Sequence, residues 1–368
     1  MRIRRCKTLI FEPQSKLVLD LPNLIDGGGG LLRQLQWVAY AGHLSDPIHL
    51  SCEEINILQN ISEVEFIDSN TLYTLYDNDL VDRLISLDIL VTENSSSDFM
   101  SRTIPWYPLA EIYYMHGRWD DVNLGTNKAL TSSPEIEFIS PNNIIPPVYL
   151  YEHNKTQVTV DLDTPNTESL DELLEKRETC RNFDCHKSIT KYTLSKIMHR
   201  VWRVKKRYVL ENGLEIVHKT SPAGGGIHAT EAYLLIRNVD DIKPGIYHYV
   251  PTRHALEMLS ELSISEIDEC IKQAVAEQEW FYNAAVYVIM TARFDRLFWK
   301  YRNHSKAFRV CNLDVGHLSQ TLYLCATDEN LGVFISAAIN EKQIEEFLFI
   351  DPVKEGIIAV AGFGPKQE

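Results

Sequence analysis

The sequence predicts a protein of mixed α/β class that is built from two parts. A small winged-helix-like domain is expected over residues 1–160, and a larger domain with a central mixed sheet flanked by helices over residues 161–368. In the larger domain, apolar runs of strand length alternate with amphipathic helical patterns, which is typical of a sheet covered by helices. The stretch 140–169 contains four prolines and little helical periodicity, so we place an interdomain connection there, with its boundary near residue 160.

Short helices and strands follow one another in the first part. The segment Ser51–Glu54 has the pattern of a capping box, in which a hydroxyl and a carboxylate each satisfy a free backbone amide at the start of a helix. Asp77 or Asn78 caps a second helix, and residues 89–91 then indicate a strand. This order suggests a winged-helix-like module. The glycine run 27–30 is interpreted as a turn, because the Lys-Ser or Lys-Thr of a phosphate loop does not follow it.

Longer elements are predicted in the larger domain. Residues 284–290 are almost all apolar, which indicates a strand buried on both faces. Apolar residues at helical spacing after Thr190 predict an amphipathic helix. The other predicted elements are a helix that begins at Ser169, a long helix over 307–327, and strands over 331–335 and 356–360, separated by a helix that Asn340 caps.

The charge of the chain excludes several classes of partner. The 368 residues contain 36 Lys and Arg against 51 Asp and Glu, a formal net charge of −15, which would repel nucleic acid and anionic membranes. The longest apolar stretches are shorter than the roughly 20 residues of a membrane-spanning helix, and no apolar core of a signal peptide follows the basic residues 2–5. We therefore expect a cytoplasmic protein. The seven cysteines include no Cys-x-x-Cys pair, so no metal site is expected.

The first segment of chemical interest is residues 177–183, directly after a predicted helix. If the segment is extended, alternation places Arg177, Thr179 and Arg181 on one side. Two guanidinium groups and a hydroxyl could hold a phosphate there through charge-assisted hydrogen bonds. A solvated loop with a coincidental pattern accounts for these residues equally well.

The second segment is the glycine-rich stretch 221–233. Three successive glycines, 224–226, remove every Cβ, so that the backbone can approach a flat ligand and direct its amides toward it. The spacing differs from the Gly-x-Gly-x-x-Gly of dinucleotide-binding folds. A plain turn is the alternative interpretation.

Together, and in this order, the two segments resemble the nitroreductase-like flavoproteins, in particular their branch of SagB-type peptide-maturation dehydrogenases. Arg177-x-Thr179-x-Arg181-x-Phe183 is similar to the Arg-x-Ser-x-Arg-x-Phe pattern of that family. Ala223 stands where the family usually has Ser. Further similar segments, in order, are residues 221–233, the Pro-Gly-Ile-Tyr-His-Tyr of 244–249, the helix signature of 314–322, and the closing segments 331–332 and 362–364. The resemblance covers roughly residues 165–368.

The resemblance implies an FMN enzyme that is usually a homodimer with its flavin at the subunit interface. It also implies cofactor-binding residues. These are Arg177, Thr179 and Arg181 for the phosphate and ribityl chain, Ser221, Ala223, Gly224 and Gly225 along the isoalloxazine, the backbone near Ala337 and Ala338 at the reactive nitrogen, and Lys366 toward the phosphate.

The third feature is the pair Lys300 and Tyr301 within an aromatic stretch. Desolvation lowers the pKa of an amine and a neighbouring cation lowers that of a phenol, so such a pair can provide a proton acceptor near neutral pH. An amphipathic helix end with a snorkelling lysine is the alternative. SagB-type azoline dehydrogenases carry a Lys-Tyr pair in this region, so the resemblance implies that Lys300 and Tyr301 are catalytic.

Within this resemblance, the expected reaction is dehydrogenation of azolines to azoles in a ribosomal precursor peptide, with other maturation enzymes as further partners. The first part would bind the leader of that peptide as an added strand. Three alternatives stay open: a flavin-dependent reductase of dehydroamino acids in a modified peptide, a small-molecule nitroreductase or quinone reductase, and a non-catalytic peptide-binding scaffold.

Overall fold

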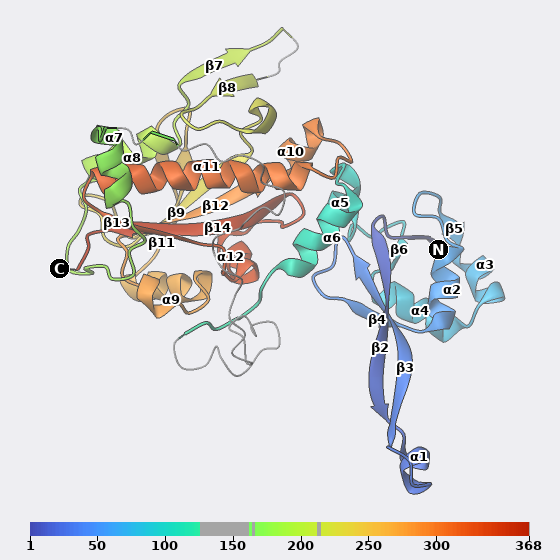
Figure 1. The fold of residues 1–368 in the computed structure, drawn as a ribbon. Coiled ribbons are helices and arrows are strands. Elements are labelled where there is room, and N and C mark those ends of the chain that lie inside the picture. Colours follow the sequence, from blue (N-terminus) through green and yellow to red (C-terminus); the bar gives the residue numbers. More distant parts are fainter. Residues whose placement is uncertain (126–161, 164–165, 212–214, 368) are drawn as a thin grey trace.

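The computed structural model describes residues 1–125, 162–163, 166–211 and 215–367. Within these ranges the strands form four sheets, the largest of six strands (Figure 1). The predicted boundary near residue 160 lies outside the described residues, so the division into 1–160 and 161–368 stays a prediction. No helix in the described ranges is both long and apolar enough to cross a bilayer.

The six-stranded sheet forms the centre of the larger part of the molecule. In spatial order its strands are β11 (Ala255–Glu261), β10 (Gly245–Val250), β9 (Thr230–Ile236), β12 (Val286–Arg293), β14 (Glu355–Gly364) and β13 (Gly332–Ser336). The predicted α/β class is confirmed. The prediction of a mixed sheet is wrong for these strands, because all five neighbouring pairs are antiparallel. An apolar run indicates burial on both faces but carries no information on the direction of the neighbouring strands.

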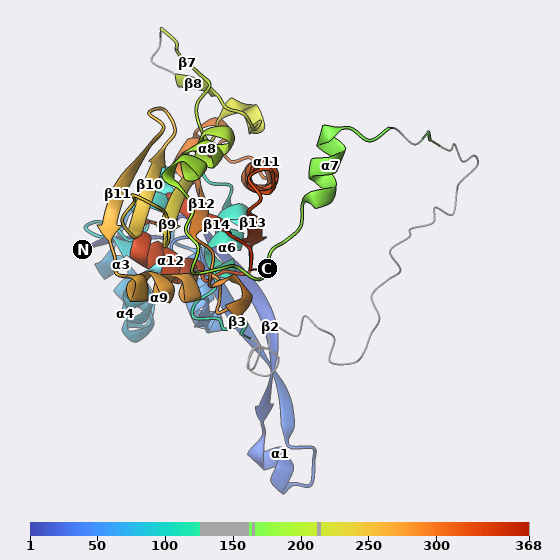
Figure 2. The ribbon, with the colours of Figure 1, turned by 90° about the vertical axis from the view of Figure 1, so that its left-hand side faces the viewer.

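Helices cover both faces of this sheet (Figure 2). On one face lie α8 (Lys191–Val201) and α11 (Ala307–Asp328), and on the other α9 (Ile264–Ala274) and α12 (Glu341–Leu348). Alternate residues of β12 are divided between the two layers: Val286, Val288 and Met290 belong to the first core cluster, and Tyr287 and Ile289 to the second. The strand buried on both faces, predicted from residues 284–290, is confirmed.

The predicted helix starts are confirmed with one exception of detail. Thr190 caps α8 by accepting a hydrogen bond from the amide of Thr193, and α7 (Ser169–Lys176) begins at the predicted residue. Asn340 precedes α12, but its side chain does not cap that helix. It binds the backbone of Val122 instead, accepting from the amide at 2.9 Å and donating to the carbonyl at 3.0 Å. A residue far away in the sequence therefore competes successfully for this amide side chain.

The first part combines small sheets with short helices. The capping box is present, since Ser51 Oγ accepts from the Glu54 amide and Glu54 Oε2 accepts from the Ser51 amide. Asp77 caps the next predicted helix. The elements are strands β1 (Arg2–Arg5), β4 (Ile48–Leu50), β5 (Ile67–Asp68) and β6 (Leu90–Thr92), and helices α2 (Cys52–Gln59), α3 (Ser69–Leu75) and α4 (Asn78–Ser86).

A long antiparallel hairpin projects from this part (Figure 1). It consists of β2 (Leu9–Leu19) and β3 (Leu31–Ala41), which pair along their whole length, with α1 (Leu21–Ile25) at the tip. Gly27 and Gly30 have positive φ angles of 82° and 67°, which glycine adopts without steric cost. The glycine run is thus a turn, as predicted, whereas the hairpin itself was not predicted.

Residues 99–122 pack against the large sheet and its helices. Two short helices begin this stretch, α5 (Phe99–Thr103) and α6 (Pro108–Gly117). The fully buried Trp106 donates its ring N–H to the carbonyl of Val353 at 3.0 Å, and its ring lies 4.2 Å from that of Phe298. Further along, the guanidinium of Arg118 forms a buried ion pair with Glu345 of α12. This stretch is therefore part of the same packed body as the large sheet.

Candidate functional site

The glycine run 224–226 forms a single 3-10 turn, η2 (Gly224–Gly226), just before β9. Gly225 and Gly226 have φ angles of +59° and +68°, a backbone conformation that glycine adopts most easily. A Cβ added to Gly224 would lie 2.1 Å from Cγ1 of Val310, so the turn presses directly against α11. The Gly224 amide donates to Asp314 Oδ1 at 2.9 Å. Burial raises the pKa of the Asp314 carboxyl, and this hydrogen bond partly offsets that rise.

The glycine turn meets the Lys300–Tyr301 pair, which is 75 residues away in the sequence. Lys300 is the last residue of α10 (Phe294–Lys300), and its Nζ donates to the carbonyl of Gly225 at 2.6 Å. A Cβ on Gly225 would lie 2.4 Å from the Tyr301 hydroxyl oxygen and 2.7 Å from Lys300 Nζ. Lys300 is exposed and Tyr301 is half-buried. The residues that the structure describes therefore do not supply the desolvation expected around the amine.

A cavity of about 710 Å³ opens beside this contact, within the range of small-molecule sites in proteins. Gly225, Gly226 and Lys300 line it, and a Cβ added to Gly226 would meet no atom within 4 Å. One wall of the cavity is therefore backbone without side chains, open to a flat group. The other eight lining residues were not among the predicted site residues; they are Glu215, Ile216, Ile227, Arg293, Asp295, Arg296, Trp299 and Arg302. The density of basic residues after β12 was the available signal in the sequence.

The predicted phosphate-binding residues lie away from this cavity. The Cys180 amide donates to the Val333 carbonyl at 2.9 Å, which fixes the segment along β13. Thr179 Oγ1 lies 3.0 Å from the Tyr323 hydroxyl, and the Arg177 guanidinium lies over the Tyr323 ring. Lys366 binds Glu178 at 2.8 Å, and with Arg177 it lowers the pKa of that carboxyl. Arg181 is exposed.

The remaining predicted positions are divided between these two places. Ser221 is buried, and its Oγ lies 3.0 Å from Oγ1 of Thr321. Ala223 directly precedes the glycine turn. Ala337 and Ala338 follow β13, the strand that also holds residue 180. Ala338 donates its amide to Ser336 Oγ and accepts from Gln278 Nε2 at 2.8 Å, and Ala337 is exposed.

Helix α11 separates the two groups of predicted flavin-binding residues. Ser221 contacts Thr321, and Thr179 contacts Tyr323. Residues two positions apart in an α-helix, such as Thr321 and Tyr323, differ by about 200° around its axis. The two contacts therefore lie on opposite sides of α11. Figure 2 looks along α11, with α7 and the C-terminus on one side of it. The cavity beside Gly225 is lined by none of Arg177, Thr179 and Arg181.

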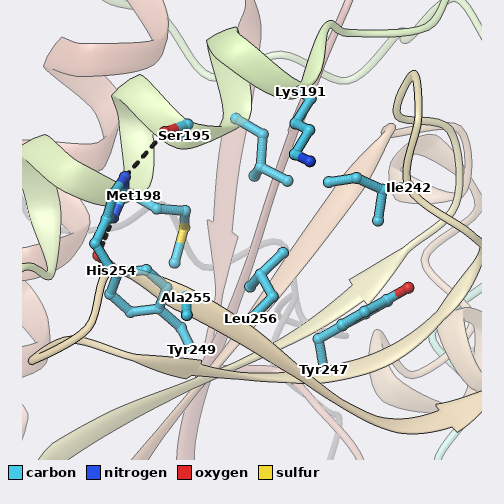
Figure 3. Close-up of a pocket in the computed structure, with 10 residues that line it drawn as sticks. Lys191, Ser195, Met198, Ile242, Tyr247, Tyr249, His254, Ala255 and Leu256 are labelled. Atoms are coloured by element: carbon cyan, nitrogen blue, oxygen red, sulfur yellow. Dashed lines mark hydrogen bonds between the residues drawn. The ribbon is translucent and has the colours of Figure 1, made fainter.

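A second cavity of about 330 Å³ lies between α8 and strands β10 and β11 (Figure 3). Leu194, Met198 and Leu256 provide part of its apolar lining. At one side His254 links two hydroxyls: its Nε2 lies 2.9 Å from Ser195 Oγ, and its Nδ1 lies 2.7 Å from the Tyr249 hydroxyl. No predicted site residue lines this cavity.

Comparison with known proteins assigns the family. The family model described as "Nitroreductase family" matches residues 174–364, which is more than half of the 368 residues. The chain therefore belongs to the nitroreductase family, whose members are oxidoreductases that generally use a flavin, FMN.

Individual proteins are similar to different extents. A protein of Methanocaldococcus jannaschii described as a nitroreductase is 28% identical over 212 residues, which are 57% of this chain and 98% of that protein. A solved Anabaena variabilis protein, also described as a nitroreductase, is 26% identical with a TM-score of 0.42; the match covers 47% of this chain and only 34% of that one. A chain of the E. coli microcin synthetase McbBCD complex, solved with truncated pro-MccB17 bound, is 18% identical with a TM-score of 0.46. The match covers 64% of this chain and 87% of that one.

The dependence of the free energy of unfolding on pH should reflect the environment of His228, which follows the glycine turn. Burial, and then the nearby Lys219 and Arg296, lower its pKa from 6.5 to about 4. Between these pH values the unfolded chain binds a proton there and the folded chain does not, so this residue makes the free energy of unfolding fall as the pH falls. We expect His228→Asn to flatten that dependence, since asparagine tolerates the φ of 49°. Urea unfolding between pH 4.5 and 7 checks it, with the exposed His186→Asn as control; equal curves for both variants would contradict it.

Proposed function

We propose that this oxidoreductase is an FMN-dependent enzyme of the SagB type, which matures a ribosomal precursor peptide by dehydrogenating azolines to azoles. The observation that carries the proposal is the meeting of Lys300 and Tyr301 with Gly225. The two candidate general bases converge there on a turn without side chains, beside a cavity large enough for a heterocycle and a flat cofactor.

The residues present fit FMN. Arg177, Arg181 and Lys366 would bind its phosphate through charge-assisted hydrogen bonds, and the open backbone at Gly226 would leave room for its ring system. When bound, FMN supplies a hydride acceptor. The amide of Gly224 is already used by Asp314, so this amide is not among the donors that we assign to the cofactor.

The proposed step removes two hydrogens from a thiazoline or oxazoline ring. The first leaves as a proton from the carbon that the adjacent C=N makes acidic, and Lys300 or Tyr301, acting as general base, accepts it. The second would leave the neighbouring ring carbon as a hydride, with its electron pair, for which bound FMN would be the acceptor. The ring gains a C=C bond and becomes aromatic. Dioxygen is the proposed final acceptor of the two electrons and is reduced to hydrogen peroxide.

A second copy of the chain would complete this site. In one chain α11 separates the group around Arg177 from the group around Gly225, so a cofactor that contacts both needs them from different copies. The outer side of α11 is suited to such a contact, because Leu313 is 58% exposed and nothing lies within 4 Å of a Cβ added to Gly316. We propose a homodimer with two equivalent sites, each built from both subunits.

The first part of the chain would bind the leader of the precursor peptide. Residues 1–160 contain 11 Lys and Arg against 21 Asp and Glu, which favours a basic or mixed leader. Its three-stranded sheet, in the order β5-β1-β6, has outer strands to which an extended peptide could add. The Lys300–Tyr301 pair then acts on a core region that the leader holds nearby.

The test uses the purified full-length chain with FMN under anaerobic conditions. Loss of the oxidised flavin absorbance on addition of a thiazoline peptide, with formation of thiazole by mass spectrometry, is the expected result. Loss of absorbance with reduced nicotinamide and not with the peptide would favour reduction of dehydroamino acids instead. Purified protein that neither carries nor binds FMN would favour the alternative of a non-catalytic peptide-binding scaffold.

A further inference from the structure

The cavity beside Gly225 has a charge opposite to that of the whole chain. Four cationic residues line it, Arg293, Arg296, Lys300 and Arg302, against the two acids Glu215 and Asp295. The chain as a whole has a formal net charge of −15. A cavity lined by one sign of charge raises the local concentration of ligands of the other sign.

Two of these cations, Arg296 and Arg302, are available to a ligand, since the Nζ of Lys300, a candidate general base, already donates to the Gly225 carbonyl. Arg293 is held by Asp295 at 3.1 Å, whereas Arg296, Lys300 and Arg302 have no ion-pair partner in the parts of the chain that the structure describes. The Nε of Arg296 donates to the Ile227 carbonyl at 2.7 Å, which keeps the guanidinium beside the glycine turn. Its outer nitrogens can still form a bidentate pair with a carboxylate.

The surroundings continue the same charge. The segment 293–309 carries six Lys and Arg and a single acid, Asp295. Next to the glycine turn, Lys219 and Arg296 depress the pKa of His228 below its ordinary value, in addition to the effect of burial. Trp299, 49% exposed, adds a flat apolar surface to the wall. The combination suits an extended substrate that has carboxylates beside a planar ring.

We infer that the peptide segment entering this cavity is acidic, with Asp or Glu next to the heterocycle that reacts, and that Arg296 and Arg302 select it. The inference rests on the proposed function, because it names the substrate class of that same site. The peptide then has two regions of different charge, a basic or mixed leader at the acidic first part and an acidic core at the cationic cavity. Each region would be repelled from the other's site, which fixes the direction in which the peptide binds.

The experiment compares two labelled synthetic peptides on the FMN-loaded full-length protein. Both carry one thiazoline; in one it is flanked by glutamates and in the other by glutamines. We expect fluorescence anisotropy to give about tenfold tighter binding of the glutamate peptide at low salt, a preference that high salt removes. Arg302→Glu should abolish the preference, and Arg33→Glu, an equal charge change on the exposed hairpin, should leave it intact.

Two outcomes would overturn the inference. One is equal binding of both peptides by the unmodified protein. The other is displacement of the glutamate peptide by NADPH, which would assign the cations to a nicotinamide cofactor. An uncharged thiazoline ester separates this test from that of the proposed function. If the ester is oxidised while the two peptides bind equally, the charge selection is contradicted and the proposed reaction is supported. If the glutamate peptide binds selectively but no thiazoline is oxidised, the charge selection is supported and the proposed reaction is contradicted.

Discussion

Replacing Lys300 with alanine, or Tyr301 with phenylalanine, is expected to lower the turnover of a thiazoline peptide by roughly 10²- to 10⁴-fold, the usual contribution of a general base. The flavin content should not change, because the proposed phosphate ligands lie on the other side of α11. Both side chains meet at Gly225, so either change disturbs the same proton-accepting position. Turnover is measured by thiazole formation, and flavin content by absorbance of the purified protein.

The chain offers matched controls for these two variants. Lys306 is an exposed lysine of the same basic segment that does not line the cavity, and Tyr192 is an exposed tyrosine of α8. Lys306→Ala and Tyr192→Phe should retain full turnover. Unchanged turnover in both Lys300→Ala and Tyr301→Phe would remove these residues from the catalytic assignment, and loss of flavin from either would indicate a structural role.

Replacing both Arg177 and Arg181 with alanine is expected to weaken FMN binding by roughly 10²- to 10⁴-fold, since each loses a hydrogen bond to a charged group. The purified protein should be colourless and should regain flavin only at high FMN concentration. Isothermal titration with FMN gives the dissociation constant. The control is the double variant Lys191→Ala with Arg253→Ala, which loses the same charge at two exposed residues away from the proposed site. It should bind FMN normally. An equal loss of FMN affinity in this control would contradict the assignment of Arg177 and Arg181.

Mixing the arginine double variant with Lys300→Ala tests whether each site is shared between subunits. If one copy supplies the Arg177 group and the other the Lys300 group, half of the randomly mixed dimers contain one intact site. About a quarter of the normal activity should then return after the two inactive variants are unfolded and refolded together. Sites built from a single chain would give no recovery.

Local chemistry made much of the fold predictable. The capping box at Ser51, the cap at Thr190 and the strand buried on both faces depend on residues close together in the sequence, and all three are present. The hairpin of β2 and β3 was missed because its exposed leucines do not follow the alternation of a half-buried strand. Asn340 was expected to cap α12 but binds Val122, a partner that only the tertiary structure brings near.

The candidate site was predictable in its parts rather than in its arrangement. The glycine turn and the Lys300–Tyr301 pair could be recognised from the sequence, and the structure brings them together. The position of the Arg177 group across α11 could not be predicted, since it depends on how the helix is oriented over the sheet. Asp314 holds the amide of Gly224, and a contact of this kind leaves no periodic signal in the sequence.

The packing of residues 99–122 determines how this protein can be divided for expression. Trp106, which has no exposed surface, is enclosed among Phe294, Phe298 and Phe308, and Arg118 neutralises a carboxylate of α12. A polypeptide beginning at residue 161 would lack this cover. It would expose an apolar patch and the unpaired carboxylate of Glu345 to water, and an exposed apolar patch favours aggregation. A shortened version that starts shortly before Phe99 would keep the cover and is the better choice for crystallising the larger part of the molecule by itself.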